Sequence, residues 1–231
     1  MKPYSPGVAV LHLLRVFCDE HGGGGNPLGV FLDGAQVPPD RRQAVAADLG
    51  LSETVFVDDA AAGAIRIFTP AAELNFAGHP TVGTAWLLAR ERDPVDVLRP
   101  PAGEVPVRYA GDETFVVGRP EWGPQFDWSR LDSAQAVDEL PQPGGAENLA
   151  AWAYSDEPAG FVRARVFPLA VGIGEDEATG AAAVQLATQV GREIEIRQGR
   201  GSRILARPAG DGRAEVGGRT VLDEVREHTL P

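Results

Sequence analysis

Two long segments of this chain are apolar on nearly every side, and they constrain the fold more than any other feature. Residues 81–92 carry one run, Val82, Ala85, Trp86, Leu87, Leu88 and Ala89. Residues 175–190 carry the other, Ala181, Ala182, Ala183, Val184, Leu186, Ala187 and Val190. A helix that lacks a polar face is stable only when other parts of the chain surround it. We therefore expect two buried helices, at Thr81–Arg92 and Glu175–Val190.

Short apolar segments bounded by Gly and Pro surround these two helices and predict strands. A surface helix is expected at Pro38–Leu49, with Asp40 as its N-cap and Gly50 at its end. The predicted strands are Val8–Val16, Gly29–Leu32, Val55–Val57, Ile65–Phe68, Val105–Val107, Thr114–Val117, Arg163–Leu169, Ile194–Arg197, Ser202–Arg207, Arg213–Val216 and Thr220–Val225.

The strand, turn and buried helix occur twice in a similar order. Arg66-Ile67-Phe68-Thr69-Pro70 precedes the first helix, and Arg165-Val166-Phe167-Pro168 precedes the second. This alignment places His79 opposite Asp176 and Gly83 opposite Gly180. Two repeats are too few for a solenoid. The pattern favours an α+β fold of two pseudo-symmetric lobes, each a β-barrel-like sheet wrapped around a central helix.

A turn-rich middle segment, Arg119–Gly145, is the expected linker because it holds four of the 19 prolines. This gives an N-terminal lobe, residues 1–118, with Glu53 and His79. The C-terminal lobe, residues 119–231, contains Asp176, and its last strands are free to return to the N-terminal lobe.

The composition excludes several classes of partner. The net charge of −12 and the lack of a Lys/Arg cluster argue against nucleic acid. No apolar stretch approaches the length of a membrane span, and the first ten residues lack the apolar core of a signal peptide. A single cysteine, Cys18, excludes an intramolecular disulfide and suits a reducing compartment. We expect a cytoplasmic protein that binds neither nucleic acid nor membrane.

Few residues of the chain suggest chemistry. The four histidines have no partners at ligand spacing, so we expect no metal site. Glu53 precedes the apolar Val55-Phe56-Val57, and burial there would raise its pKa toward the range useful in proton transfer. The alternative is a solvated glutamate in a loop.

His79 and Asp176 are expected at the starts of the two buried helices. Two converging helix N-termini would bind a substrate carboxylate through backbone N–H groups. An ordinary N-cap aspartate and a capping or core histidine are the alternatives. Gly78 and Gly180 would let the backbone approach the ligand closely, although helix packing explains them as well.

A set of motifs, in order along nearly the whole chain, resembles the PhzF-like phenazine biosynthesis isomerase family, which has the diaminopimelate epimerase-like fold. The matching segments are Gly25-Asn26-Pro27-Leu28, Leu51-Ser52-Glu53-Thr54-Val55-Phe56-Val57, Phe68-Thr69-Pro70 with Glu73, Gly78-His79-Pro80-Thr81, Glu175-Asp176, Ala178-Thr179-Gly180, and Gln198-Gly199 before Ser202.

The resemblance implies an active-site cleft between two lobes, no cofactor, and a homodimer. It implies that Glu53 is the proton-shuttling glutamate and that His79 and Asp176 bind the substrate. The racemases of this fold use two cysteines as acid and base. Because this chain has one cysteine, amino-acid racemisation by two thiols is excluded.

The sequence departs from the family pattern at several positions. Arg15 stands where an acidic residue is usual, and Ala77 replaces a frequent Cys. Ala181 stands where the phenazine isomerases carry a serine, which we expect to disfavour the phenazine-pathway substrate.

These observations predict a cofactor-independent isomerase that moves a proton between carbons of a small carboxylated metabolite, cyclic or unsaturated. Glu53 is the predicted catalytic residue, and the predicted substrate-binding residues are His79, Asp176, Gly78, Gly180 and Ala181. An epimerase or cyclase of a secondary-metabolite pathway that uses the same site is an alternative. A family member that only binds a ligand is another.

Overall fold

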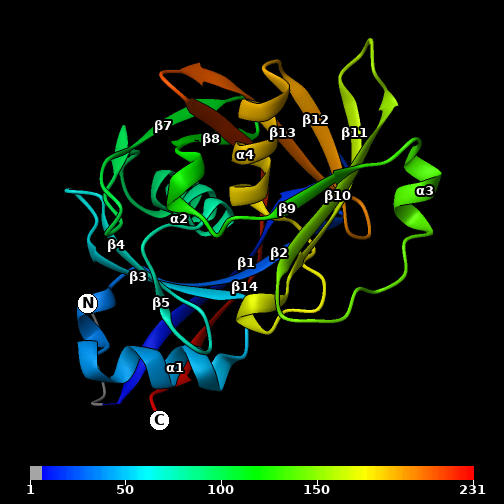
Figure 1. Cartoon of the computed structure of the whole chain (residues 1–231). Coiled ribbons are helices and arrows are strands. Elements are labelled where there is room, and N and C mark those ends of the chain that lie inside the picture. The colour runs from blue at the N-terminus through cyan, green and yellow to red at the C-terminus, as the bar shows by residue number, and fades with distance from the viewer. Residues whose placement is uncertain (1–6) are drawn as a thin grey trace.

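The computed structural model describes residues 7–231, which form a mixed sheet of fourteen strands with two helices packed inside its curvature (Figure 1). Residues 1–6, part of the segment considered above for a signal peptide, lie outside the described residues. The strands are β1 (Val8–Cys18), β2 (Gly24–Phe31), β3 (Glu53–Asp59), β4 (Ala64–Phe68), β5 (Glu73–Leu74), β6 (Val97–Leu98), β7 (Val105–Ala110), β8 (Glu113–Gly118), β9 (Asp127–Arg130), β10 (Asn148–Asp156), β11 (Phe161–Pro168), β12 (Ile194–Gln198), β13 (Ser202–Gly210) and β14 (Arg213–Thr229).

Four α-helices accompany the strands in the described part of the chain. They are α1 (Arg42–Leu49), α2 (Gly78–Glu91), α3 (Ala134–Asp138) and α4 (Gly180–Val190). The helix α2 packs against β1, β2, β3, β8 and β14, whereas α4 packs against β13 and β14. Both are lined by buried apolar side chains, as their lack of a polar face predicts. The predicted α+β class and the two buried helices are confirmed.

One continuous path of hydrogen-bonded strands runs through the sheet in the order β5-β4-β3-β2-β1-β14-β13-β12-β11-β10-β9. The long strand β14 pairs with β13 and β8 along its first half and with β1 along its second half. Strands from both sides of residue 118 therefore share this one partner. The division into an N-terminal and a C-terminal lobe at residue 118 stays a prediction.

Three local predictions were wrong. The helix α4 begins at Gly180 and not at Glu175, because the backbone N–H of Asp176 donates to the carbonyl of Val166 in an isolated bridge. Asp40 is not the N-cap of α1, since it lies in a 3₁₀ turn before the helix. Gly50, with a φ of 61°, ends that helix as predicted.

The third correction concerns the proline-rich segment 119–145, which is more than a linker. It contains a 3₁₀ turn at Pro120–Trp122, the strand β9 and the short helix α3. Buried Gln185 of α4 holds the first of these elements by donating to the carbonyls of Pro120 and Pro124. This segment therefore packs over the start of α4.

The described residues contain no helix that is both long enough and apolar enough to cross a membrane.

Candidate active site

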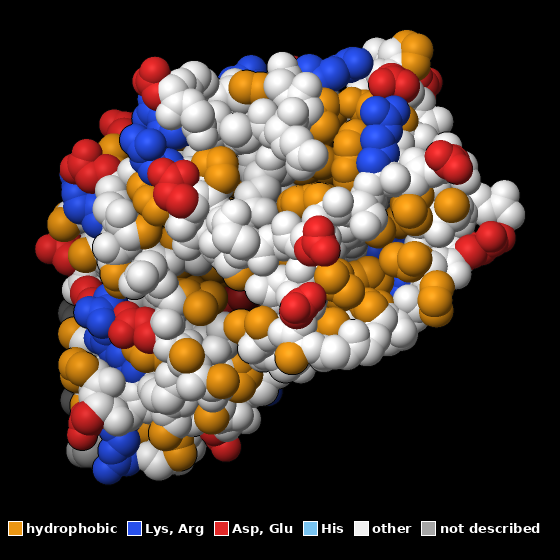
Figure 2. All heavy atoms as spheres, in the orientation of Figure 1, with side chains coloured by type: hydrophobic (Ala, Val, Ile, Leu, Met, Phe, Trp, Pro, Cys, Tyr) orange, Lys and Arg blue, Asp and Glu red, His pale blue; other side chains and the backbone are white. Residues whose placement is uncertain are grey.

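All six residues predicted for the site line one cavity of about 370 Å³. Glu53, Gly78 and His79 come from the first half of the chain, and Asp176, Gly180 and Ala181 from the second half. Figure 2 shows a hollow on this face of the molecule, with apolar side chains around it and an acidic side chain deep inside. The structure thus brings together residues that are far apart in the sequence, while their roles stay predictions.

Glu53 is the first residue of β3 and pairs in parallel register with Leu28 of β2. Its side chain is only 12% exposed. Burial disfavours the charged form of a carboxyl group, and the nearby carboxyl group of Asp176 disfavours it further. Together these effects raise the pKa of Glu53 well above its ordinary value. The raised pKa favours the protonated form, in which a carboxyl group can donate a proton to a carbon atom.

His79 is the second residue of α2, and its side chain is 4% exposed. Its ring donates a hydrogen bond to the carbonyl of Pro27, while burial lowers the pKa of His79 to about 3. The ring is therefore neutral at physiological pH. Nε2 of His79 lies 3.1 Å from Oε2 of Glu53. The two atoms are not aligned as a hydrogen bond, and neither has another hydrogen-bond partner in the described chain.

Asp176 lies in the loop before α4 and not at the helix start, which corrects the predicted placement. Its Oδ1 accepts a hydrogen bond of 2.8 Å from Nδ2 of Asn26, and its Oδ2 accepts one of 2.6 Å from the Thr179 hydroxyl. Burial nevertheless raises the pKa of Asp176 to about 6. Asp176 therefore faces the cavity as a second buried carboxyl group whose orientation is held by donors.

The two buried helices meet at their first residues. A Cβ atom added to Gly78 would lie 2.7 Å from Cα of Gly180, and one added to Gly180 would lie 2.8 Å from Cα of Gly78. Only glycine permits this approach of two backbones. Both helices begin at these glycines, so the helix starts correspond at Gly78 and Gly180, and not at Gly83 and Gly180 as the sequence alignment predicts.

The helix ends leave backbone donors at the cavity. Neither N-cap residue, Ala77 of α2 or Thr179 of α4, caps its helix through a side chain. The first N–H groups of each helix have no intrahelical partner, and they carry the positive end of the helix dipole. Ala181 is the second residue of α4 and so lies at the N-terminal end of the helix. The two ends can bind an anionic group between them.

Sequence reasoning missed several residues of the site. Asn26 and Gln198 stand in the quoted motifs, but nothing local indicated that they surround Asp176. Gln198 donates to the hydroxyl of Thr179 and to the carbonyl of Asp176. Three aromatic side chains also line the cavity, namely Phe76, Trp122 and Phe126.

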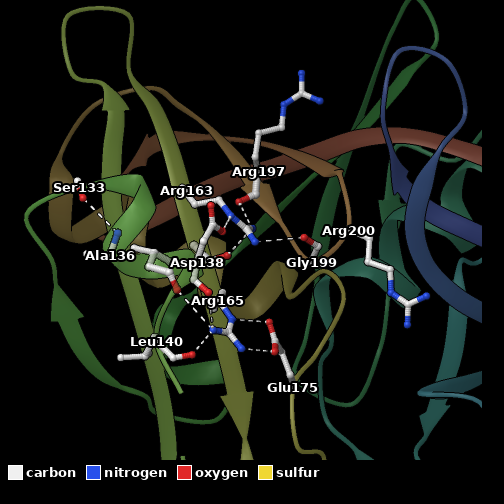
Figure 3. Close-up of polar contacts among 12 residues, drawn as sticks. Ser133, Ala136, Asp138, Leu140, Arg163, Arg165, Glu175, Arg197, Gly199 and Arg200 are labelled. Atoms are coloured by element: carbon white, nitrogen blue, oxygen red, sulfur yellow. Dashed lines mark hydrogen bonds and ion pairs between the residues drawn. The ribbon is translucent and has the colours of Figure 1, made fainter. Parts of the chain in front are cut away.

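The loop that carries Asp176 is held by contacts with the neighbouring strand β11 (Figure 3). Arg165 of β11 forms a two-pronged ion pair with Glu175, at 2.8 and 2.7 Å. The same guanidinium group donates to the carbonyl of Leu140 beyond α3. These contacts fix the residue next to Asp176 and so restrict the position of its carboxyl group.

Other chemical groups do not converge on the cavity. In residues 7–231 no group of three or more His, Cys, Asp or Glu side chains is placed to hold a metal ion. Cys18 is buried elsewhere, at the end of β1, and burial raises the pKa of its thiol to about 11.

Comparison with known proteins identifies the family. The family model described as phenazine biosynthesis-like protein matches residues 14–149. A trans-2,3-dihydro-3-hydroxyanthranilate isomerase of Pseudomonas aeruginosa is 32% identical, and the match covers 81% of this chain and 86% of that relative. The chain therefore belongs to the phenazine biosynthesis-like, or PhzF, family, and it is an enzyme of the isomerase class.

Two solved structures show the same fold. A PhzF-family phenazine biosynthesis protein of Bacillus anthracis gives a TM-score of 0.81 at 17% identity, covering 96% of this chain and 99% of that chain. A predicted epimerase of Pseudomonas aeruginosa gives 0.75 at 25% identity, covering 95% and 99%. The epimerase-like fold expected from the sequence is confirmed.

The burial of Glu53 predicts a pH-dependent effect of Glu53→Gln on stability. Above pH 4.5 the unfolded chain releases the Glu53 proton, while the folded protein retains it because its pKa is raised. The folded wild type thus loses stability as the pH rises from 4.5, by at most about 1.4 kcal/mol per pH unit from this group. The Gln variant has no such loss. We expect its free energy of unfolding, relative to wild type, to increase from pH 5 to pH 8.

Denaturant unfolding of both proteins at a series of pH values measures this difference. Glu104→Gln, at a side chain that is 70% exposed, controls for the loss of one negative charge at the surface. A difference between wild type and Glu53→Gln that is constant over the whole range would contradict the assigned burial.

Proposed function

We propose that this protein is a cofactor-independent isomerase that moves a proton between carbons of a small carboxylated metabolite, with Glu53 as the acid and base. The proposal combines the isomerase class of the family with the chemistry of the cavity. A cavity of about 370 Å³ suits a small molecule. The substrate would be cyclic or unsaturated, and a double bond next to the reacting carbon would stabilise the charge that forms when a proton is transferred.

One observation carries the proposal. Oε2 of Glu53 and Nε2 of His79 are both buried and have no hydrogen-bond partner, although they lie side by side at the cavity. A buried polar atom without a partner destabilises the folded protein by about 1–3 kcal/mol. Such a cost is typical of groups reserved for a ligand. The neutral ring of His79 donates to Pro27 and so leaves Nε2 as an acceptor for a substrate group.

The other site residues bind and orient the substrate in this proposal. Its carboxylate lies between the starts of α2 and α4, at the N–H groups of Gly78, Gly180 and Ala181. His79 and Asp176 flank the reacting carbon atoms. Glu53 exchanges one proton with each of two carbons and ends in the protonation state in which it began. The isomerisation therefore balances without an oxidant, a reductant or a cofactor.

Ala181 bears on the choice of substrate. The residue is 8% exposed and lies at the cavity wall. It offers no hydroxyl to pair with a polar group of a ligand. A site with such a hydroxyl rejects ligands that lack the matching polar group, whereas an apolar site accepts them more readily. We propose that this enzyme converts trans-2,3-dihydro-3-hydroxyanthranilate poorly and prefers a related acid without the matching polar group.

An epimerase or cyclase that uses the same residues would give a different product from the same exchange chemistry, so identification of the product separates them. We also propose a cytoplasmic homodimer, supported by the single free cysteine and by the family resemblance.

Solvent exchange tests the proton transfer. In D₂O the carboxyl group of Glu53 carries deuterium, so turnover of trans-2,3-dihydro-3-hydroxyanthranilate, even if slow, should place solvent deuterium on a product carbon. Glu53→Gln keeps the shape of the side chain but cannot relay a proton, and we expect the rate of exchange to fall ~10²–10⁴-fold. Mass spectrometry of the product measures both. A Gln variant with near-normal exchange would remove Glu53 from the mechanism.

A second prediction concerns Ala181→Ser. If the missing hydroxyl sets the preference, this variant should convert trans-2,3-dihydro-3-hydroxyanthranilate faster than wild type, by about 10-fold or more. Initial rates for the two proteins, measured side by side, decide the matter. A fast wild type that gains nothing from serine would show that Ala181 only packs the start of α4, where alanine is the best helix former.

A further inference from the structure

Asn26 is a fully buried polar residue that joins the two halves of the site. It lies in β2 and is 1% exposed. Its Nδ2 donates 2.8 Å to Oδ1 of Asp176 and 2.9 Å to the carbonyl of Ala178, while its Oδ1 accepts 3.1 Å from the hydroxyl of Ser52. Two acceptors and one donor around the amide define its orientation. Both hydrogens of the amide nitrogen are therefore committed to the loop before α4.

The two carboxyl groups of the cavity differ in the donors that surround them. Both oxygens of Asp176 accept side-chain hydrogen bonds, one from Asn26 and one from Thr179, and the backbone N–H of Glu177 also donates to this carboxyl group. Oε2 of Glu53 accepts none and lies 3.1 Å from the Nε2 atom of His79. Hydrogen bonds donated to a carboxylate favour its charged form. The geometry thus favours the negative charge on Asp176.

The charge on one carboxyl group determines the state of the other. Two carboxylates in one buried site repel each other, so the group without donors keeps its proton when the other is ionised. The remaining acidic groups around the pair already have partners. These are Glu73 of β5 with Arg66, Glu175 with Arg165 (Figure 3), and Glu177 with the Ser202 hydroxyl and the Arg200 N–H. His79 of α2 is the other titratable neighbour, and it is neutral.

We propose that Asn26 is a positioning residue that, together with Thr179, holds the negative charge on Asp176 and so leaves the transferable proton on Glu53. The enzyme then meets its substrate with Glu53 as the acid. Glu53 first donates its proton to one carbon, and the resulting carboxylate removes a proton from a second carbon. This order of steps rests on the proposed function, whereas the distribution of charge between the two carboxyl groups does not.

Carboxyl-group titration by ¹³C NMR tests the charge distribution without a substrate. The two signals are assigned with Glu53→Gln and Asp176→Asn. In Asn26→Ala, Asp176 loses a donor, so its midpoint should rise by about one pH unit. Glu53 then has a less charged neighbour, so its midpoint should fall. Two midpoints that move toward each other show that the charge on Asp176 controls the protonation of Glu53. A merely structural role of Asn26 would not produce this pattern.

A second variant covers the case in which Asn26→Ala does not fold. Thr179→Val removes the donor at the other oxygen of Asp176. As in Asn26→Ala, the midpoint of Asp176 should rise and that of Glu53 should fall. Thr188→Val is the matched control, because the hydroxyl of Thr188 donates only to the Val184 carbonyl within α4. The control should leave both midpoints unchanged.

The outcomes separate this proposal from the proposed function. Midpoints that stay in place in a folded Asn26 or Thr179 variant would overturn the role of these donors. So would midpoints that move in the same direction, or an equal shift in Thr188→Val. Each of these results leaves the proton relay by Glu53 standing, whereas loss of the relay itself is reported by the deuterium exchange of Glu53→Gln.

Discussion

The burial of two carboxyl groups beside a neutral histidine is the constraint on which the rest of this site depends. Glu53 and Asp176 would both be charged at neutral pH in water, and burial raises the pKa of each. His79 cannot compensate with a positive charge, because its own pKa is lowered to about 3. Such an arrangement destabilises the fold, and the surrounding structure must offset that cost.

The fold supplies this compensation through its connectivity. The long strand β14 pairs with strands from both halves of the chain, so the two buried helices are held by one sheet. Their starts touch at Gly78 and Gly180. This contact sets the separation of the two helix ends, and with it the position of the backbone donors that face the cavity. In the proposed function, a substrate carboxylate between these ends would need no Lys or Arg side chain.

The sequence predicted the parts of the structure that depend on burial alone. Two helices without a polar face had to be internal, and both are. The start of α4 was placed five residues too early, because local preference does not show that the N–H of Asp176 pairs with Val166 across the chain. The contact between Asn26 and Asp176 spans 150 positions and was equally invisible. Glu53, His79 and Asp176 were singled out largely because the sequence resembles a known family.

Direct observation of the protonated carboxyl group of Glu53 tests the central claim most simply. Infrared difference spectroscopy of wild type minus Glu53→Gln at neutral pH isolates the carbonyl stretch of a carboxylic acid. We expect that band in the wild-type spectrum and expect it to be missing from the variant, since burial retains the proton on Glu53. A wild-type protein without the band would mean that Glu53 is ionised in the cavity, which would contradict this account of the site.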